Sequence, residues 1–252
     1  MVDLHSHILA GLDDGARTLE ESVQIAETAA DDRISVMAAT PHVRDDYPTA
    51  AETMERLVLE LEGILREKGI GLRVLGGAEI SIQRLKTLSD RELSIFGLGG
   101  NPRYLLVEFP YFGWPLSLET EIWTLRSRGI TPVLAHPERN PEVQLAPARV
   151  AALVAAGALV QLTAASVDGR LGRRNKHTAA TLIASGHAHI IASDAHWPGL
   201  RAGGLSNAAA AVGDPELASW LTQGVPSAIV EDEPIPPRPQ TKPKSLRRRL
   251  RI

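Results

Sequence analysis

Short apolar runs alternate with helical patterns along most of the 252-residue chain, and this alternation limits the possible folds more than any other feature. Strands that are separated by helices pair in parallel, through right-handed crossovers. The predicted strands are Val2–His5, Ser35–Ala39, Arg73–Gly77, Tyr104–Phe109, Thr131–Ala135, Leu159–Thr163 and His189–Ala192. The predicted helices are Leu19–Asp31, Ala50–Lys68, Leu116–Arg128, Pro147–Ala156 and His177–Ser185. About seven such units predict an α/β barrel rather than an open sheet.

The ends of several predicted helices carry their own signals. Thr18 precedes the first helix and Glu21 follows Thr18 by three residues, which predicts a capping box. A glycine that stands between a helix and the next strand commonly ends the helix. Three glycines stand at such places, namely Gly129, Gly157 and Gly186. These signals support the predicted order of helices and strands.

The charge of the chain is uneven. The net charge is −3, but residues 238–252 contain seven basic residues and no acidic one. The other residues carry 20 basic and 30 acidic side chains, which gives them a net charge of −10. An acidic domain disfavours nucleic acid as a partner and suits a protein that binds divalent cations. The chain has no cysteine, which excludes disulfides, thiolate zinc sites and a cysteine nucleophile.

The last part of the chain differs from the rest in composition. Residues 231–252 are rich in proline and then in arginine, with little apolar content. We therefore expect one domain at residues 1–230 and a flexible tail at residues 231–252. The chain begins without an export signal and has no apolar run of about 20 residues, which predicts a cytoplasmic protein. The basic tail suggests contact with an anionic surface at the inner face of the membrane.

Imidazole and carboxylate side chains stand at the ends of six predicted strands. They are His5, His7, His42, Glu79, Glu108, His136, Asp194 and His196. Because the carboxyl ends of parallel barrel strands meet on one face, we expect these side chains to converge. Clustered carboxylates repel one another unless cations neutralise them, and imidazole with carboxylate is the ligand mixture of Zn²⁺, Mn²⁺ and Fe²⁺ sites. The number of ligands predicts about two to three ions, and Asp13 or Asp14 lies near enough in sequence to His7 to add an oxygen ligand.

The remaining histidines fit structural roles. His187 and His189 form a His-x-His pair around the start of a strand, and His177 lies on a predicted helix. A carboxylate at a strand end is also more often a helix cap than a metal ligand. The metal site is predicted because six strand ends carry ligand-type residues together, and no single motif would be sufficient.

The order and spacing of these residues resemble a known family. Motifs of the PHP (polymerase and histidinol phosphatase) superfamily are matched by Asp3-Leu4-His5-Ser6-His7, His42, Glu79, His136 and Asp194-Ala195-His196. Five segments resemble one family within that superfamily, the manganese-dependent protein-tyrosine phosphatases of bacterial capsule and exopolysaccharide operons. They are Gly11–Ala16, Ala39–His42, Gly77–Ile80, Leu106–Pro110 and His136–Arg139. The resemblance covers residues 1 to about 230.

The resemblance implies a distorted (β/α)7-type barrel with a trinuclear centre, for which manganese is expected first and iron or zinc are alternatives. The implied ligands are His5, His7, Glu79 and Asp194 for one ion, Asp14, His42 and His196 for a second, and Glu79, Glu108 and His136 for a third, with Glu79 bridging. Arg139 and Arg201 match arginines that grip the substrate phosphate. Asp14 and His42 join these arginines as implied catalytic residues.

The implied activity is hydrolysis of phosphotyrosine on a bacterial tyrosine kinase that regulates capsule or exopolysaccharide synthesis, by in-line attack of a metal-bound hydroxide. A tyrosine side chain has a pKa near 10, so it leaves without a dedicated general acid. The alternatives are a small-molecule phosphatase of the same superfamily, such as a histidinol-phosphate hydrolase, a metal-dependent amidohydrolase and a non-catalytic module. The chain departs from the family at Val43 and Trp197, which we expect at the rim of the site, where they would affect substrate preference.

Overall fold

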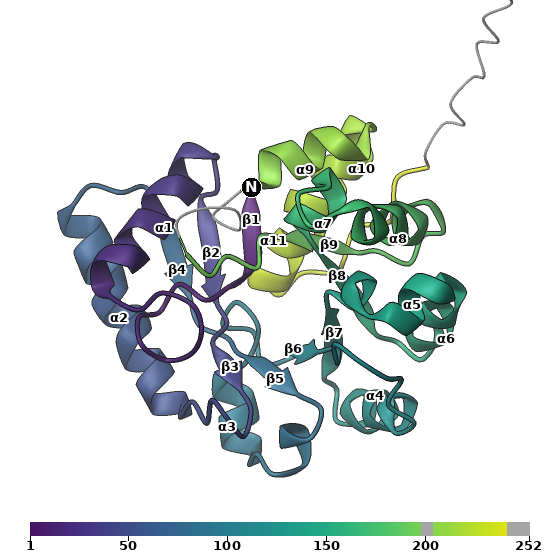
Figure 1. Ribbon diagram of the computed structural model, residues 1–252. Coiled ribbons are helices and arrows are strands. Elements are labelled where there is room, and N and C mark those ends of the chain that lie inside the picture. The colour runs from purple at the N-terminus through teal and green to yellow at the C-terminus, as the bar shows by residue number, and fades with distance from the viewer. Residues whose placement is uncertain (198–203, 241–252) are drawn as a thin grey trace, which may run out of the picture.

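The computed structural model describes residues 1–197 and 204–240 (Figure 1). The strands are β1 (Val2–Ser6), β2 (Val36–Ala39), β3 (His42–Val43), β4 (Arg73–Leu75), β5 (Glu79–Ser81), β6 (Tyr104–Glu108), β7 (Thr131–Ala135), β8 (Leu159–Thr163) and β9 (Ile190–Ala192). The α-helices are α1 (Leu19–Asp31), α2 (Ala51–Glu67), α3 (Asp90–Ile95), α4 (Leu118–Ser127), α5 (Pro141–Leu145), α6 (Val150–Ala155), α7 (Ala164–Asp168), α8 (Arg173–Ala184), α9 (Leu205–Val212), α10 (Pro215–Ser219) and α11 (Val225–Val230). Short turns of other helix types are η1 (Arg84–Lys86), η2 (Pro137–Arg139), η3 (Pro147–Arg149) and the π-helical η4 (Trp220–Gly224). None of the described helices is long and apolar enough to cross a membrane.

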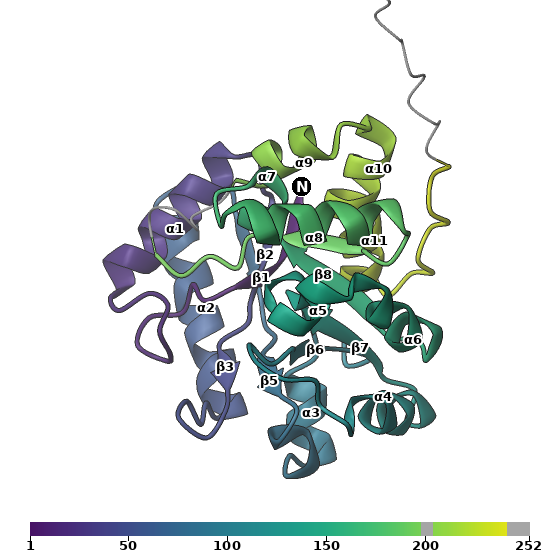
Figure 2. The same cartoon turned by 45° about the vertical axis from the view of Figure 1, so that its right-hand side comes forward.

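The described strands follow one another round a ring. Their pairings are all parallel, in one sheet of order β1-β2-β4 and another of order β3-β5-β6-β7-β8-β9. Two residues separate β2 from β3 and three separate β4 from β5, so the first sheet continues into the second. At the other side, Ser6 of β1 pairs with Ala195 beyond β9, and His7 N donates to Ala195 O at 2.7 Å. The long helices lie outside this ring (Figures 1 and 2), so the predicted parallel α/β fold is confirmed, and the order of neighbours is the one expected of a distorted barrel.

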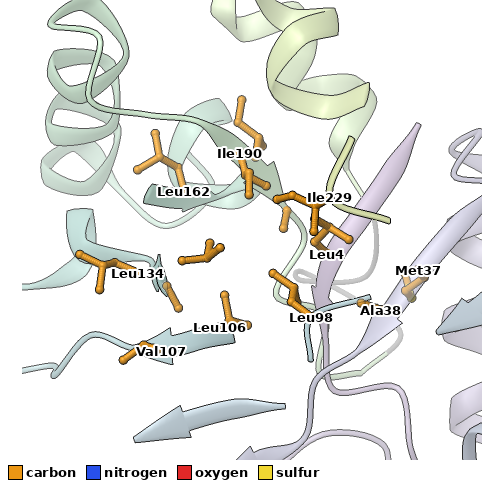
Figure 3. Packing of buried hydrophobic residues seen from close by; sticks show 14 of the residues in the cluster. Leu4, Met37, Ala38, Leu98, Leu106, Val107, Leu134, Leu162, Ile190 and Ile229 are labelled. Atoms are coloured by element: carbon orange, nitrogen blue, oxygen red, sulfur yellow. The ribbon is translucent and has the colours of Figure 1, made fainter. Parts of the chain in front are cut away.

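Apolar side chains of neighbouring strands pack into one core (Figure 3). Leu106 of β6, Leu134 of β7 and Leu162 of β8 are completely buried. Leu4 of β1 lies beside Ile229, and α11 packs on β1. Burial of each such side chain stabilises the fold by ~1.5–3 kcal/mol. This packing fixes the strands, so the residues that follow each strand are held in place at one face.

Several predicted boundaries are confirmed and others are wrong. Thr131–Ala135 and Leu159–Thr163 are strands as predicted. The predicted strand Arg73–Gly77 is too long, because β4 ends two residues earlier and the chain resumes as β5. The predicted helix His177–Ser185 begins too late, because α8 starts at Arg173. Both errors lie in segments where glycine or basic residues obscure the apolar pattern.

The predicted helix-end signals are confirmed in part. Thr18 Oγ1 accepts a hydrogen bond from Glu21 N at 3.3 Å, so Thr18 is the N-cap of α1. The reciprocal half of the capping box is wrong, because the Glu21 carboxylate accepts from Arg17 N at 2.8 Å. The three glycines that were predicted to end helices all have a left-handed φ, of 76°, 101° and 81° at Gly129, Gly157 and Gly186.

Residues 231–240 form no helix or strand, but they contact the domain. Trp220 Nε1 donates to Pro236 O at 2.8 Å, and the Arg238 guanidinium donates to two main-chain carbonyl groups at 2.7 and 3.0 Å. These contacts show that the first part of the predicted flexible tail packs on the domain, while the boundary at residue 230 stays a prediction. Residues 241–252, which hold six of the seven basic residues of the tail, lie outside the described residues.

Candidate metal centre

The side chains predicted at the strand ends lie close together, and Asp14 lies with them. Four overlapping groups bring candidate ligand atoms within 4.8 Å of one another: His7, Asp14, His42 and His196; His5, Glu79 and His136; His5, His7 and Asp194; and His42, Glu79 and Glu108. The strand-end side chains are buried, whereas the Asp14 side chain is half exposed. The structure therefore brings together the whole predicted ligand set.

Hydrogen bonds at the far side of two imidazoles determine which nitrogen faces the cluster. His5 Nδ1 donates to Gln161 Oε1 at 3.0 Å, and His7 Nδ1 donates to Asp13 Oδ2 at 2.7 Å. In a neutral imidazole with Nδ1 protonated, Nε2 carries a lone pair. The two Nε2 atoms lie 3.3 Å apart. Two lone pairs in this position repel each other unless a proton or a metal ion lies between them.

The same two Nε2 atoms face two carboxylates. Both lie 3.3–3.4 Å from Glu79 Oε2 and 3.6 Å from Asp194 Oδ1. A tetrahedral ion with bonds of about 2.1 Å needs its donor atoms about 3.4 Å apart. The two nitrogen atoms therefore have ligand spacing to each other and to each of the two carboxylate oxygens.

Further donor atoms extend the cluster on both sides of this group. Asp14 Oδ1 lies 3.4 Å from His42 Nε2 and 3.6 Å from His196 Nε2. Glu79 reaches in two directions, since Oε1 lies 2.8 Å from His136 Nε2 and Oε2 lies 3.1 Å from His42 Nδ1. Glu79 Oε2 and His42 Nδ1 are buried without a hydrogen-bond partner, which a metal ion would satisfy. This geometry suits a bridging role for Glu79.

The neighbours of Glu108 differ from the implied ligand grouping. Glu108 lies with His42 and Glu79, whereas the grouping implied by the resemblance places it with Glu79 and His136. Its Oε1 also accepts a hydrogen bond from Arg44 at 2.8 Å, a contact that the sequence did not predict. Burial and the charge of Glu79 raise the pKa of Glu108. Arg44 therefore offsets a charge that the fold makes costly.

The ionisable groups influence one another strongly. Burial lowers the pKa of His7, but the Asp13 carboxylate, together with Asp194 and Glu79, raises that pKa well above its usual value. Burial likewise lowers the pKa of His5, but Glu79 and Asp194 raise it overall. Burial alone would raise the pKa values of Glu79 and Asp194. The surrounding imidazoles, among which His5 has the largest effect, instead hold both pKa values well below their usual range. The cluster therefore keeps Glu79 and Asp194 charged and attracts positive charge.

The loop between β1 and α1 fixes the position of His7. Asp13 Oδ2 accepts from His7 Nδ1 and from His42 N at 2.9 Å, while Asp13 Oδ1 accepts from Gly15 N at 2.9 Å. A Cβ atom on Gly15 would lie 2.2 Å from His7 O, so only glycine fits at this close approach. Asp13 was predicted as a possible oxygen ligand together with Asp14. The structure instead gives it the role of orienting His7.

Two candidate ligands have a left-handed backbone. The φ angle is 39° at His136, just after β7, and 55° at Asp194, just after β9. Such angles are uncommon outside glycine and cost ~1–3 kcal/mol each. Neighbouring strands hold them, because His136 N donates to Gln161 O and Asp194 N donates to His5 O, each at 2.9 Å. Strain of this kind is typical of functional sites.

Arg139 reaches the cluster. Its Nη1 donates to Asp194 Oδ2 at 2.7 Å, and its guanidinium lies 4.9 Å from the centre of the Tyr111 ring. Two acidic residues near Arg139 in the sequence have other partners, since Glu138 accepts from Thr163 N and Glu142 pairs with Arg149. Arg201, the second predicted phosphate ligand, lies outside the described residues.

The His-x-His pair that was predicted to be structural has other contacts. His189 Nδ1 accepts from Val160 N at 3.1 Å, and His187 Nδ1 lies 2.9 Å from Ser185 Oγ. The prediction that Val43 lies at the rim is wrong, because Val43 is completely buried in β3. Trp197 is 45% exposed and its ring lies 5.7 Å from that of His196.

Three residues of the site were missed by sequence reasoning or given another role. They are Gln161, which bonds His5; Asp13, which bonds His7; and Arg44, which bonds Glu108. Gln161 does carry a signal, because it is a polar residue in the middle of an apolar strand. Asp13 and Arg44 lie in loops, where spacing gives no orientation.

Comparisons with known proteins place the chain in a family. The family described as "Capsular polysaccharide synthesis, CpsB/CapC" matches residues 1–215. The putative tyrosine-protein phosphatase CapC of Staphylococcus aureus and the tyrosine-protein phosphatase YwqE of Bacillus subtilis are each 34% identical over 199 residues, covering 78% of this chain and 77% of the relative.

The fold is also similar to a solved structure. The match is to a chain from the crystal structures of YwqE from Bacillus subtilis and CpsB from Streptococcus pneumoniae, described as unique metal-dependent tyrosine phosphatases. The TM-score is 0.85 at 29% identity, over 96% of this chain and 100% of the other. With a family match over most of its length, the chain belongs to the CpsB/CapC family of capsular polysaccharide synthesis.

Proposed function

We propose that the chain is a metal-dependent protein-tyrosine phosphatase that acts on a bacterial tyrosine kinase of capsule or exopolysaccharide synthesis. Two relatives named as tyrosine-protein phosphatases support hydrolysis of phosphotyrosine as the reaction. The buried imidazoles of His5 and His7 carry the proposal, because both lie at ligand spacing from a Glu79 oxygen and from an Asp194 oxygen.

Manganese is the proposed metal, with iron or zinc as alternatives. The donor set contains imidazoles and carboxylates and no thiolate, and its nine side chains exceed the needs of a single ion. Divalent ions would supply a coordinated water molecule of lowered pKa and positive charge for the phosphate oxygens. The side chains of the donor set would hold the ions in place, and Asp13 and Gln161 orient two of its imidazoles.

Arg139 is the proposed phosphate ligand among the described residues. A guanidinium binds two phosphate oxygens at once, and it remains charged in this site because its pKa is raised by Asp194 despite burial. Its bond to Asp194 holds the guanidinium beside the donor atoms. Arg139 would thus stabilise charge that develops on the transferring group.

Aromatic side chains around the donor set support an aryl phosphate as the substrate. The Tyr47 ring lies 5.8 Å from that of His42, Tyr111 lies 5.7 Å from His136, and Trp197 lies 5.7 Å from His196. Aromatic residues form only 4% of the chain, so three of them against candidate ligands is a concentration. A phenyl ring packs well against such side chains, whereas a serine phosphate would leave them uncovered.

A turnover comparison tests the proposal. Purified protein with Mn²⁺ is given a phosphotyrosine peptide, a phosphoserine peptide of the same sequence and histidinol phosphate. The proposal expects the highest kcat/KM for the phosphotyrosine peptide and loss of all turnover on chelation. Preference for histidinol phosphate would instead identify a small-molecule phosphatase, and turnover that survives chelation would refute the metal centre.

A further inference from the structure

One stretch of the acidic chain contains only positive charge. Residues 169–193 include no Asp or Glu, although the chain has 30 acidic residues. The same stretch includes Arg170, Arg173, Arg174 and Lys176. Most of these residues lie at the start of α8, whose first turn has no acidic residue.

A groove lies between α8 and α5. Its volume is about 440 Å³, and it is lined by Pro141, Gln144, Leu145, Arg173, Arg174, His177 and Thr178. Figure 2 shows α5 beside α8, and the two helices pack together. One wall is basic, whereas the other carries Leu145, which is 86% exposed. The groove thus offers cations and an apolar surface side by side.

The groove adjoins the metal centre. α5 begins two residues after Arg139, and α8 packs on η2, the turn that includes Arg139. Gln144 Nε2 donates to Glu138 O at 3.0 Å and to Asn175 Oδ1 at 2.8 Å, which joins the two walls beneath the groove. The groove therefore lies next to the turn that carries Arg139, and a ligand bound by Arg139 would lie near it.

The arginines of the groove are not neutralised by the fold. Arg173 and Arg174 are exposed, and no carboxylate of the described residues forms an ion pair with either of them. Nearby Arg149, by contrast, pairs with Glu142 at 2.7 Å. Cations in the first turn of a helix also oppose its dipole and reduce its stability. Their position is therefore unfavourable for the fold and suits an anionic ligand.

We infer that this groove binds an acidic peptide segment next to the phosphotyrosine that enters the metal centre. The inference rests on the proposed function, because it concerns the substrate of the same site. Acidic side chains of the peptide would pair with Arg173 and Arg174, while its apolar side chains cover Leu145. A concave groove with one apolar wall fits a peptide better than the flat surface of a membrane. The surrounding acidic domain repels the same peptide elsewhere.

Kinetics with matched peptides test the inference. Two phosphotyrosine peptides differ only in their flanks, which are Asp and Glu in one and Asn and Gln in the other, and phenyl phosphate serves as a third substrate. In the double variant Arg173→Gln/Arg174→Gln, KM for the acidic peptide should rise roughly 3- to 30-fold at unchanged kcat, as expected for the loss of two exposed ion pairs. KM for the other two substrates should stay within error, and the rise should shrink at high salt.

The control variant removes the same charge elsewhere. Arg66→Gln/Lys68→Gln changes two exposed residues at the end of α2, just before β4 and so at the opposite end of the ring. It should leave all three KM values unchanged. An equal rise for both peptides in the groove variant, or a rise in the control, would overturn the inference. The inference would also be overturned if the groove variant lost binding to anionic vesicles while its KM for the acidic peptide stayed normal. In that case the two arginines would bind a membrane surface.

Equilibrium binding separates this inference from the proposed function. The probe is the acidic peptide with a difluoromethylphosphonate in place of the phosphate, which cannot be hydrolysed, and its affinity is measured by fluorescence anisotropy. If the groove variant binds the probe more weakly and the control variant does not, the groove binds the acidic peptide, even if phosphotyrosine is not turned over. Equal affinity of the wild-type protein and the groove variant would overturn it even if the chain is an active phosphatase.

Discussion

Replacing Asp13 by asparagine should weaken metal binding without removing any proposed ligand. Asp13 uses both carboxylate oxygens, which accept from His7 Nδ1, His42 N and Gly15 N at 2.7–2.9 Å. An asparagine has one oxygen, so its amide N–H would face at least one of these donors. His7 would then turn or carry its proton on Nε2, the atom that faces the donor set. Loss of such an orienting contact reduces metal affinity about 10- to 100-fold, or ~1.4–2.7 kcal/mol.

The measurement is a titration with Mn²⁺ against a competing chelator, together with elemental analysis after dialysis. Asp45→Asn is the matched control, because it removes the same charge from a side chain that is 86% exposed and pairs only weakly with Arg84, at 3.6 Å. The control should bind manganese as the wild-type protein does. If Asp13→Asn also retains wild-type affinity, His7 is not oriented as we argue and the donor geometry around it is not a metal site.

Three further predictions follow from particular contacts. Arg139→Lys keeps the charge but loses the planar fork, so kcat/KM for a phosphotyrosine peptide should fall roughly 10²-fold at full metal content, and near-normal turnover would place the phosphate ligand elsewhere. The pKa values of His5 and His7 are raised in the fold. Without ions, their protonated forms therefore stabilise the fold below about pH 6.5, and this stabilisation is lost as the pH rises through the raised pKa values. Metal binding releases those protons, so the rise in Tm on adding Mn²⁺ should be larger at about pH 8 than at about pH 6. Scanning fluorimetry at several pH values measures this rise, and a rise that does not change with pH would contradict the prediction. Arg238→Ala should lower the free energy of unfolding in urea by about 1–3 kcal/mol, because two main-chain carbonyl groups lose a charged donor.

The site was predictable from the sequence because parallel strands direct their carboxyl ends to one face. His5, Glu79 and Asp194 are far apart in the chain, yet each follows or ends an apolar run that reads as a strand. The left-handed φ at Asp194 was not predictable, because no glycine marks it. Whether these side chains bind metal stays a prediction until ions are observed.

Short elements and side-chain orientations were beyond the sequence. α5 and α7 have five residues each, too few to show helical periodicity, and neither was predicted. The contacts of Arg44 and Gln161 depend on how loops and strands pack, which spacing does not encode. The packing of Arg238 was missed for a related reason, because a proline-rich segment can dock on a surface without forming regular structure.

The buried donor set is proposed to hold the ions on which the reaction depends. Crystals of active, manganese-loaded protein, measured at the manganese absorption edge, test it directly through the anomalous difference map. We expect one peak among His5, His7, Glu79 and Asp194, and a second beside Asp14, His42 and His196. Active protein with no peak at either position, or with its manganese bound elsewhere, would show that the donor set is not the metal centre.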